Sequence, residues 1–198
     1  MEKILKRDIK IDALLDKGIE LLWSKGYNAT SVNDIVKVAG IPKGSFYFYF
    51  DSKEDFAVKA IDKYFEETFT PAKQILLNKA ISPKQRLLDF HQFRYDMLKN
   101  EMNCKMGCMA CNIGNEMSEH SELIRTRILK KEQYILSIIT EVIKEAQDLG
   151  EITSTMPAAD IAAFIEDAGK GSMTTMKEMN SSYPIDNFMN MVRHVLLK

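Results

Sequence analysis

Residues 26–56 read GYNATSVNDIVKVAGIPKGSFYFYFDSKEDF, and this stretch decides the fold of the chain. Apolar residues recur at helical spacing over 32–39, and Ser31 with Asp34 forms a capping pair at the start of this short helix. The sequence Gly-Ile-Pro at 40–42 predicts a tight turn, and a further helix begins at its proline, which is tolerated in a first helical turn. Two short helices about a turn that contains glycine predict a helix-turn-helix.

The residues at the start of the second helix are candidates for contacts with DNA. In a helix-turn-helix the second helix lies in the major groove, with its N-terminal residues toward the base edges. Lys43 can donate hydrogen bonds to guanine O6 and N7, Gly44 allows the backbone to approach closely, and Ser45 can bond to either strand. Lys53 opens the next helix, where its charge adds to the attraction that helix amides exert on a phosphate.

The aromatic run FYFYF at 46–50 has two interpretations. Phe46 and Phe50 lie one turn apart and are expected in the core, so that Tyr47 and Tyr49 project outward, where a phenol can reach a phosphate. The alternative is that the helix-turn-helix serves only packing and that the whole run is core. Consecutive aromatic side chains are difficult to bury all round one short helix, so the run favours DNA binding.

Helix-period patterns also fill most of the remaining chain, which predicts an all-α protein. One helix runs through Ile11–Trp23 and ends at Gly26, a typical C-cap residue. Ser52, three residues before Asp55, is the expected N-cap of the helix that follows the aromatic run. The pattern then predicts helices over roughly 53–78, 83–100, 107–118, 121–149, 158–179 and 185–197, and no convincing strand.

The composition limits the class of protein. The 198 residues are 45% hydrophobic, enough to bury a core, and carry a net charge of −1. Residues 1–53 hold nine Lys or Arg against seven Asp or Glu, so DNA binding must rest on a few placed contacts rather than on a basic coat. Short apolar runs and the lack of an apolar leader predict a cytoplasmic protein with no membrane partner. Since no serine-histidine-aspartate set, phosphate loop or HExxH motif is present, we expect no enzyme.

The segment from Leu22 to Glu54 closely resembles the DNA-binding domain of TetR/AcrR-type regulators. It departs from their pattern at Pro42, where Ser or Thr is common, and at Tyr49, where His is common, and both departures bear on the operator sequence. The matching residues are Leu22-Trp23, Lys25-Gly26-Tyr27, Ala29-Thr30-Ser31-Val32, Asp34-Ile35, Ala39-Gly40, Lys43-Gly44-Ser45-Phe46-Tyr47, Tyr49-Phe50 and Ser52-Lys53-Glu54.

The resemblance implies an all-α homodimer. A three-helix helix-turn-helix DNA-binding domain at 1–55 would precede a helical ligand-binding and dimerisation domain at 56–198. The implied function is that of a ligand-responsive transcriptional repressor without a cofactor, which binds a palindromic operator in double-stranded DNA and is released by a small molecule or by thiol modification. The implied DNA-binding residues are Val32, Asn33, Lys43, Gly44, Ser45, Tyr47, Phe48, Tyr49 and Lys53.

Three cysteines, Cys104, Cys108 and Cys111, have four interpretations. Their C-x3-C-x2-C spacing matches the cluster motif of radical S-adenosylmethionine enzymes, although the chain has no predicted strands for the barrel of such an enzyme. A zinc or sensor-metal site needs a further ligand, for which His91 and His120 are candidates. The cysteines can also pack as small apolar residues, and the fourth interpretation is thiol sensing.

Thiol sensing is indicated by the string Gly107-Cys108-Met109-x-x-Asn112-x-x-x-Glu116. This string resembles the GCL-x-x-N-x-x-x-E element of a subgroup of TetR/AcrR-type regulators, some of which answer to acrylate-like, electrophilic or oxidising compounds. In those relatives the position of Cys108 can carry the reactive thiol. The predicted helix start at Gly107 favours a thiolate there, because unpaired helix amides stabilise negative charge.

Two further surfaces are expected in the C-terminal part of the chain. Flexible and aromatic side chains in its middle suit either an ordinary core or a pocket for an unknown small apolar or electrophilic effector, and the predicted pocket or sensor residues are Phe93, Met97, Cys108, Met109 and Asn112. Two apolar stripes near the C-terminus suit a four-helix dimer seam, and the predicted interface residues are Phe164, Ala168, Ser172, Met176, Met189 and Val192. An enzyme that uses the cysteine cluster and a helical adaptor with no role at DNA are the competing functions.

Overall fold

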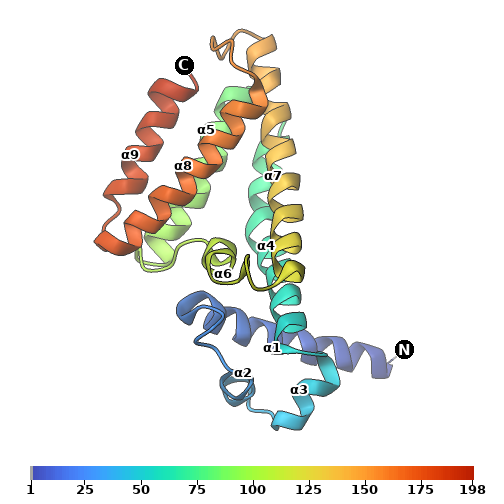
Figure 1. The fold of residues 1–198 in the computed structure, drawn as a ribbon. Helices are drawn as coiled ribbons and strands as arrows, with labels where there is room; N and C mark the ends of the chain where they lie inside the picture. Colours follow the sequence, from blue (N-terminus) through green and yellow to red (C-terminus); the bar gives the residue numbers. More distant parts are fainter. Residues whose placement is uncertain (1) are drawn as a thin grey trace. The chain divides into compact units, whose positions relative to one another are not determined.

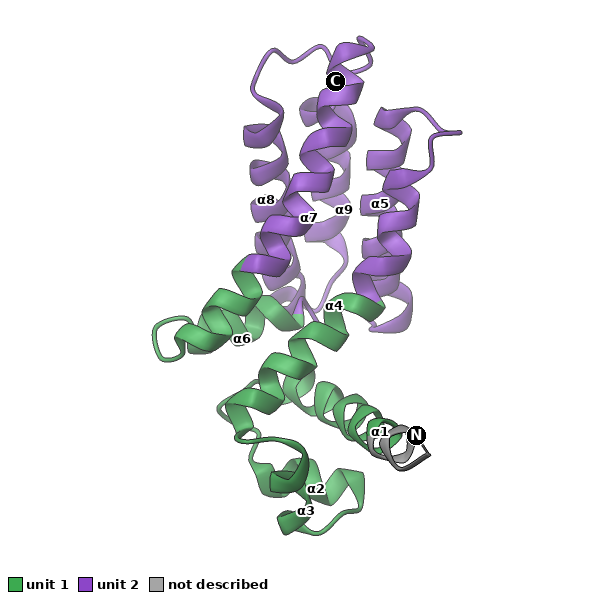
Figure 2. Ribbon diagram, turned by 90° about the vertical axis from the view of Figure 1, so that its right-hand side faces the viewer, with its two compact units in different colours: residues 1–67, 109–129 green, residues 68–108, 130–198 purple. Residues whose placement is uncertain are grey.

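The computed structural model describes residues 2–198 as helices joined by turns, and no β-strand occurs among these residues, which confirms the all-α prediction (Figure 1). None of the helices described combines the length and the apolar character that a membrane crossing requires. The helices pack into two compact units (Figure 2). One consists of the residues up to Glu67 together with Met109–Leu129, and the other of Thr68–Cys108 together with Lys130–Lys198. The predicted division of the chain after residue 55 stays a prediction.

The first unit contains the helix-turn-helix and the segment that returns to it late in the sequence. It includes α1 (Glu2–Lys25), α2 (Val32–Ala39), α3 (Lys43–Tyr49), the beginning of α4 (Lys53–Leu77), α6 (Met109–Met117) and the beginning of α7 (Glu122–Asp148). Helix α1 ends because Gly26 has a φ of +85°, a left-handed conformation that glycine adopts without steric cost. This confirms the predicted C-cap.

An aromatic core joins α1, α3 and α4 within the first unit. The rings of Phe46 and Phe50 lie 5.6 Å and 4.9 Å from the ring of Phe56 on α4, and all three side chains are buried. This confirms the prediction that Phe46 and Phe50 point inward. Gly18 lets α1 approach this core closely, because a Cβ at that position would come within 2.0 Å of the Phe56 ring.

The second unit is a set of helices built from the rest of the chain. It contains the remainder of α4 and α7 with α5 (Pro83–Asp96), η1 (Met97–Glu101), α8 (Ala158–Met179), α9 (Tyr183–Met191) and η2 (Val192–Leu196). The helices predicted over 83–100 and 185–197 are therefore each completed by a wide π-helical turn. After η1, Asn103 and Cys104 have φ values of +49° and +60°, which end the helical path. The next helix begins at Met109, two residues later than predicted.

A buried arginine ties three helices of the second unit together. Arg86 on α5 donates a hydrogen bond of 2.8 Å to the carbonyl oxygen of Leu76 on α4. Its guanidinium also lies 2.8 Å from the carboxylate of Glu145 on α7. Because Arg86 is almost fully buried, this pairing offsets the cost of removing its charge from water.

Candidate nucleic-acid interface

Helix α2 is fixed at both ends by its own sequence. The Ser31 hydroxyl accepts a hydrogen bond from the Asp34 amide at 3.1 Å, and the Asp34 carboxylate accepts one from the Ser31 amide at 2.8 Å, which confirms the predicted capping pair. The Ser31 hydroxyl also donates to the Asp34 carboxylate, and this hydrogen bond, together with the one from the Ser31 amide, lowers the pKa of Asp34. Gly40 closes the helix with a φ of +66°, so the chain turns at once toward α3.

The first turn of α3 is open to an incoming ligand. Lys43 and Gly44 are exposed, and a Cβ built on Gly44 would meet no atom within 4 Å. Pro42 occupies the N-cap position and makes no side-chain cap, so no side chain of the helix competes for the first amides. Such an N-terminus is suited to an anionic group. On the neighbouring α2, Val32 is half-buried and Asn33 is exposed.

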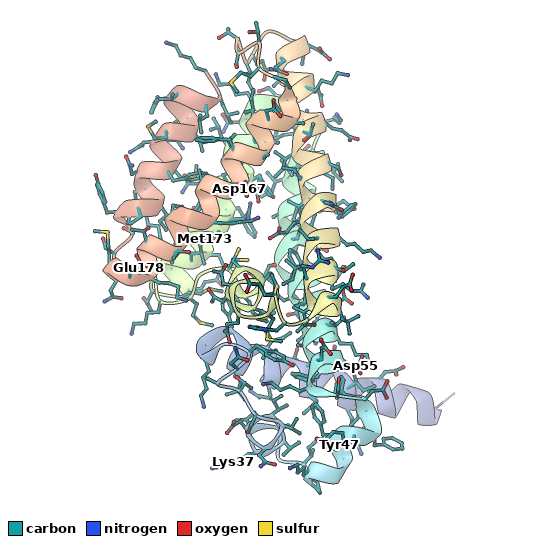
Figure 3. All side chains as sticks on the ribbon, viewed as in Figure 1. Lys37, Tyr47, Asp55, Asp167, Met173 and Glu178 are labelled. Carbon is teal, nitrogen blue, oxygen red and sulfur yellow. The ribbon has the colours of Figure 1, made fainter. Side chains whose placement is uncertain are left out.

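The aromatic run divides between core and surface. Figure 3 shows Tyr47 on α3 and Lys37 on α2, the two helices of the motif. Tyr47 is 54% exposed, as expected, and Phe48 is 69% exposed. Tyr49 is half-buried, and its ring packs edge-on against Phe48 with 5.2 Å between the ring centres. Two large aromatic side chains left exposed on one short helix indicate a contact surface.

Lys53 is the first residue of α4, as the sequence predicted. Its ammonium group lies 4.0 Å above the centre of the Tyr27 ring, a cation–π contact. Burial lowers the pKa of Lys53, while the nearby carboxylates of Glu116 and Asp34 raise it. The side chain is thus held in place by the loop that precedes α2.

Glu116 is a residue whose role sequence reasoning missed. Its two carboxylate oxygens accept hydrogen bonds from the amides of Tyr27 (3.1 Å) and Asn28 (2.7 Å). The string Gly107-Cys108-Met109-x-x-Asn112-x-x-x-Glu116 includes this residue but does not indicate its hydrogen-bond partners. Its position at the end of α6 brings it to the α1–α2 loop within the first unit.

The residues predicted for an effector pocket belong to both units. Phe93, Met97 and Cys108 lie in the second unit, whereas Met109 and Asn112 lie on α6 in the first. Met109 is fully buried, Phe93 is exposed, and the other three are partly buried. A single pocket made by these residues stays a prediction.

The three cysteines are free thiols of intermediate exposure. Cys108 immediately precedes α6, and it interacts electrostatically with Arg94 and Tyr95. Among the side chains that the structure describes, no three from His, Cys, Asp or Glu gather as a metal site would require.

A polar cluster in the second unit, partly buried, was not predicted. Arg94 on α5 donates a hydrogen bond of 2.7 Å to Glu166 on α8, and His91 lies beside the same carboxylate. Burial opposes both charges, but their pairing outweighs it: Glu166 raises the pKa of Arg94, and the Arg94 guanidinium lowers the pKa of Glu166. Burial raises the pKa of the neighbouring Tyr95. Only the helical spacing of His91, Arg94 and Tyr95 on α5 could have hinted at this cluster.

An apolar hollow of about 480 Å³ lies between α8 and α9. Three of the predicted interface residues line it: Phe164, which is 59% exposed, Ala168 and Ser172. The other three predicted interface residues are buried in the core of the chain itself. They are Met176, Met189 and Val192. Exposed apolar side chains from Met179, Tyr183 and Met191 also line the hollow.

The capped α2, the tight turn and the exposed α3 define a DNA-binding protein of the helix-turn-helix class. Family models agree with this geometry. The model described as "Bacterial regulatory proteins, tetR family" matches residues 14–60, and the one described as "Tetracyclin repressor-like, C-terminal domain" matches residues 83–192.

Individual relatives extend over nearly the whole chain. The transcriptional repressor DhaR of Mycobacterium sp. (strain GP1) is 28% identical over 184 residues, which cover 93% of this chain and 90% of DhaR. The crystal structure of regulatory protein TetR from Rhodobacter sphaeroides has a TM-score of 0.84 at 26% identity and covers 91% of this chain and 95% of that one. The reduced form of Escherichia coli NemR shares the fold, with a TM-score of 0.85 at 21% identity and coverage of 94% and 96%. The chain belongs to the TetR family and is a transcriptional regulator with a DNA-binding helix-turn-helix.

Proposed function

We propose that this regulator is a repressor that binds a palindromic operator as a homodimer and is released by a small effector or by modification of a thiol. The observation that carries the proposal is the exposed face of α3, on which Lys43, Gly44, Tyr47 and Phe48 stand clear of the core. A buried Phe46 beneath them gives this face a fixed support.

The DNA contacts are divided between base edges and phosphates. Lys43, with Gly44 and Ser45, reads the major groove, because these residues form the first turn of the recognition helix. Tyr47, Phe48, Tyr49 and Lys53 follow along the groove wall, and Val32 with Asn33 meets the backbone at the start of α2. Phosphate contacts of this kind hold the helix in register but carry no sequence information.

The apolar hollow between α8 and α9 is the proposed dimer interface. Large apolar side chains there are exposed in a single chain, which Phe164 illustrates. A second copy of the same face would cover them, since an interface about a twofold axis uses one patch twice. Pairing two chains in this way would present two recognition helices to one duplex.

Release is proposed to begin at Cys108. A thiolate at this position would be stabilised by the adjacent helix start and by the Arg94 guanidinium. NemR has been crystallised in a form described as reduced, and this relationship supports thiol chemistry as one route of release. A non-covalent effector beside Phe93 and Met97 is the alternative route.

Footprinting on the DNA upstream of the protein's own gene tests this proposal. Two protected half-sites are expected, with centres about 34–36 Å apart on one side of the duplex, together with a near-palindromic sequence. Light scattering on the same sample should give the mass of a dimer. Protection of one unsymmetrical site by a single chain would refute the homodimer proposal, and absence of any protection would favour a helical adaptor.

A further inference from the structure

The carboxylate of Glu116 closes the loop between α1 and α2. One oxygen accepts a hydrogen bond from the Tyr27 amide at 3.1 Å, and the other accepts one from the Asn28 amide at 2.7 Å. Hydrogen bonds from amides to an ionised carboxylate are stronger than those between neutral groups. Both oxygens are therefore used to hold two consecutive residues of a loop that lies 88 and 89 positions away in the sequence.

The loop is shaped to receive this carboxylate. A Cβ at Gly26 would come within 2.1 Å of Glu116 Oε1, so a side chain at this residue would push the carboxylate away from the two amides. The φ of +85° at Gly26 turns the following amides toward the same point. Thr30 secures the other end of the loop, because its hydroxyl donates to the Gly26 carbonyl at 2.7 Å.

The loop in turn carries a cation of the DNA-binding surface. The Lys53 ammonium rests 4.0 Å above the Tyr27 ring, and the Glu116 charge also acts on it. Glu116 thus fixes the backbone of Tyr27, and the ring of Tyr27 fixes the position of Lys53. These three residues come from α6, from the α1–α2 loop and from α4, all within one compact unit.

We propose that Glu116 is a positioning residue for operator binding, which sets the place of Lys53 through Tyr27. The inference rests on the proposed contact of Lys53 with a DNA phosphate. Since Glu116 stands at the end of α6, the place of α6 determines whether the Lys53 charge faces the phosphate. The Ser121 hydroxyl donates separately to Glu54, so the turn after α6 stays attached when Glu116 is changed.

The test measures operator affinity at several salt concentrations for the full-length protein and for Glu116→Ala. Loss of the two hydrogen bonds of Glu116 is expected to weaken operator binding about tenfold. It should also reduce the slope of log affinity against log salt by about 2 per dimer, because each chain loses one phosphate contact. Removing a negative charge should by itself tighten binding to DNA, so weaker binding points to position rather than to charge. Glu116→Gln keeps one acceptor oxygen, so its operator affinity should lie between those of the parent and of Glu116→Ala.

Two controls separate positioning from a general loss of structure. Glu119→Ala removes an exposed carboxylate three residues further on and should bind the operator at least as tightly as the parent. Tyr27→Leu removes the ring but keeps the amide, and combining it with Glu116→Gln should cost little more than Tyr27→Leu alone, because both act on Lys53. Thermal melting followed by circular dichroism checks the fold of each variant.

Each result has a distinct meaning. If the parent binds the operator and both Glu116 variants keep its affinity and salt slope, the inference is wrong while the proposed function stands. If affinity falls but the salt slope does not, Glu116 acts on the fold and not on Lys53, which also overturns the inference. If the parent itself binds no operator, the proposed function fails first.

Discussion

His91 Nδ1 lies 4.0 Å from Glu166 Oε1, and neither ring nitrogen of His91 makes a hydrogen bond within the part of the chain that the structure describes. The side chain is only 1% exposed. Burial without hydrogen-bond partners strongly disfavours the charged form of an imidazole. Burial lowers the pKa of His91 to about 4, although the Glu166 carboxylate opposes this effect and the Arg94 guanidinium adds to it.

The lowered pKa of His91 predicts a loss of stability in mild acid. In the unfolded chain His91 has a pKa near 6.5 and takes up a proton below that pH, whereas in the folded chain it stays neutral down to pH about 4. The free energy of unfolding therefore falls as the pH drops between these two values. The expected loss between pH 7 and pH 5 is about 2 kcal/mol per chain. Urea unfolding at fixed protein concentration measures it.

The matched variants are His91→Leu and His120→Gln. His91→Leu should flatten the pH dependence between 5 and 7, whereas His120→Gln, at an exposed position, should keep the slope of the parent. Equal slopes in the parent and in His91→Leu would show that other groups control stability in this range.

Lys43 and Lys53 are predicted to affect DNA binding in different ways. Lys43→Ala should relax the preference at one base pair of each half-site, at a cost of about 1–3 kcal/mol, because it removes a base contact. Lys53→Ala should weaken binding to all sequences alike and reduce the salt dependence. The affinities of the Lys43→Ala and Lys53→Ala proteins are measured for the operator, for an operator with one base pair changed and for unrelated DNA. Lys144→Ala, on the exposed side of α7, is the control for the loss of one positive charge. Identical specificity profiles would contradict this division.

Ala168→Glu should separate the proposed dimer. Ala168 lines the hollow between α8 and α9, and a second chain seated there would bury the new carboxylate without a partner. The expected cost is about 3 kcal/mol, on the order of a hundredfold in the dissociation constant of the dimer. Light scattering reports the mass, and Thr174→Glu on the exposed side of α8, outside the hollow, should remain dimeric. An unchanged dimer in Ala168→Glu would place the interface elsewhere.

Cys108 is predicted to be the thiol whose modification releases DNA. A bulky group added immediately before α6 would not fit beside the buried Met109 without moving the helix. Cys108→Ser, Cys104→Ser and Cys111→Ser would each be treated with a maleimide, and operator affinity measured before and after. Only Cys108→Ser should keep its affinity. If it loses the operator as readily as the parent, the cysteines have no switching role at this position.

Local features of the fold could be predicted because their causes are neighbours in the sequence. Ser31 and Asp34 cap α2 across three residues, and Gly26 ends α1 by its own conformation. The burial of Phe46 and Phe50 follows from their one-turn spacing. These contacts were enough to place the helix-turn-helix and its exposed face.

The clamps between distant segments could not be predicted from spacing. Glu116 meets the α1–α2 loop and Gly18 meets Phe56 only because of how the helices pack. The helical spacing of apolar residues also predicted that Met176 and Met189 are covered by other side chains, but it does not indicate whether these belong to the same chain or to a second copy. In the structure their own chain does.

The anchoring of α3 by Phe46 and Phe50 has a consequence for how such a regulator acquires new targets. The residues that hold the helix face inward, and those that would read DNA, such as Lys43 and Tyr47, face outward. Substitutions on the outer face therefore leave the supporting core unchanged. Gene duplication followed by a few such substitutions can redirect a copy to a different promoter while its folding stays intact.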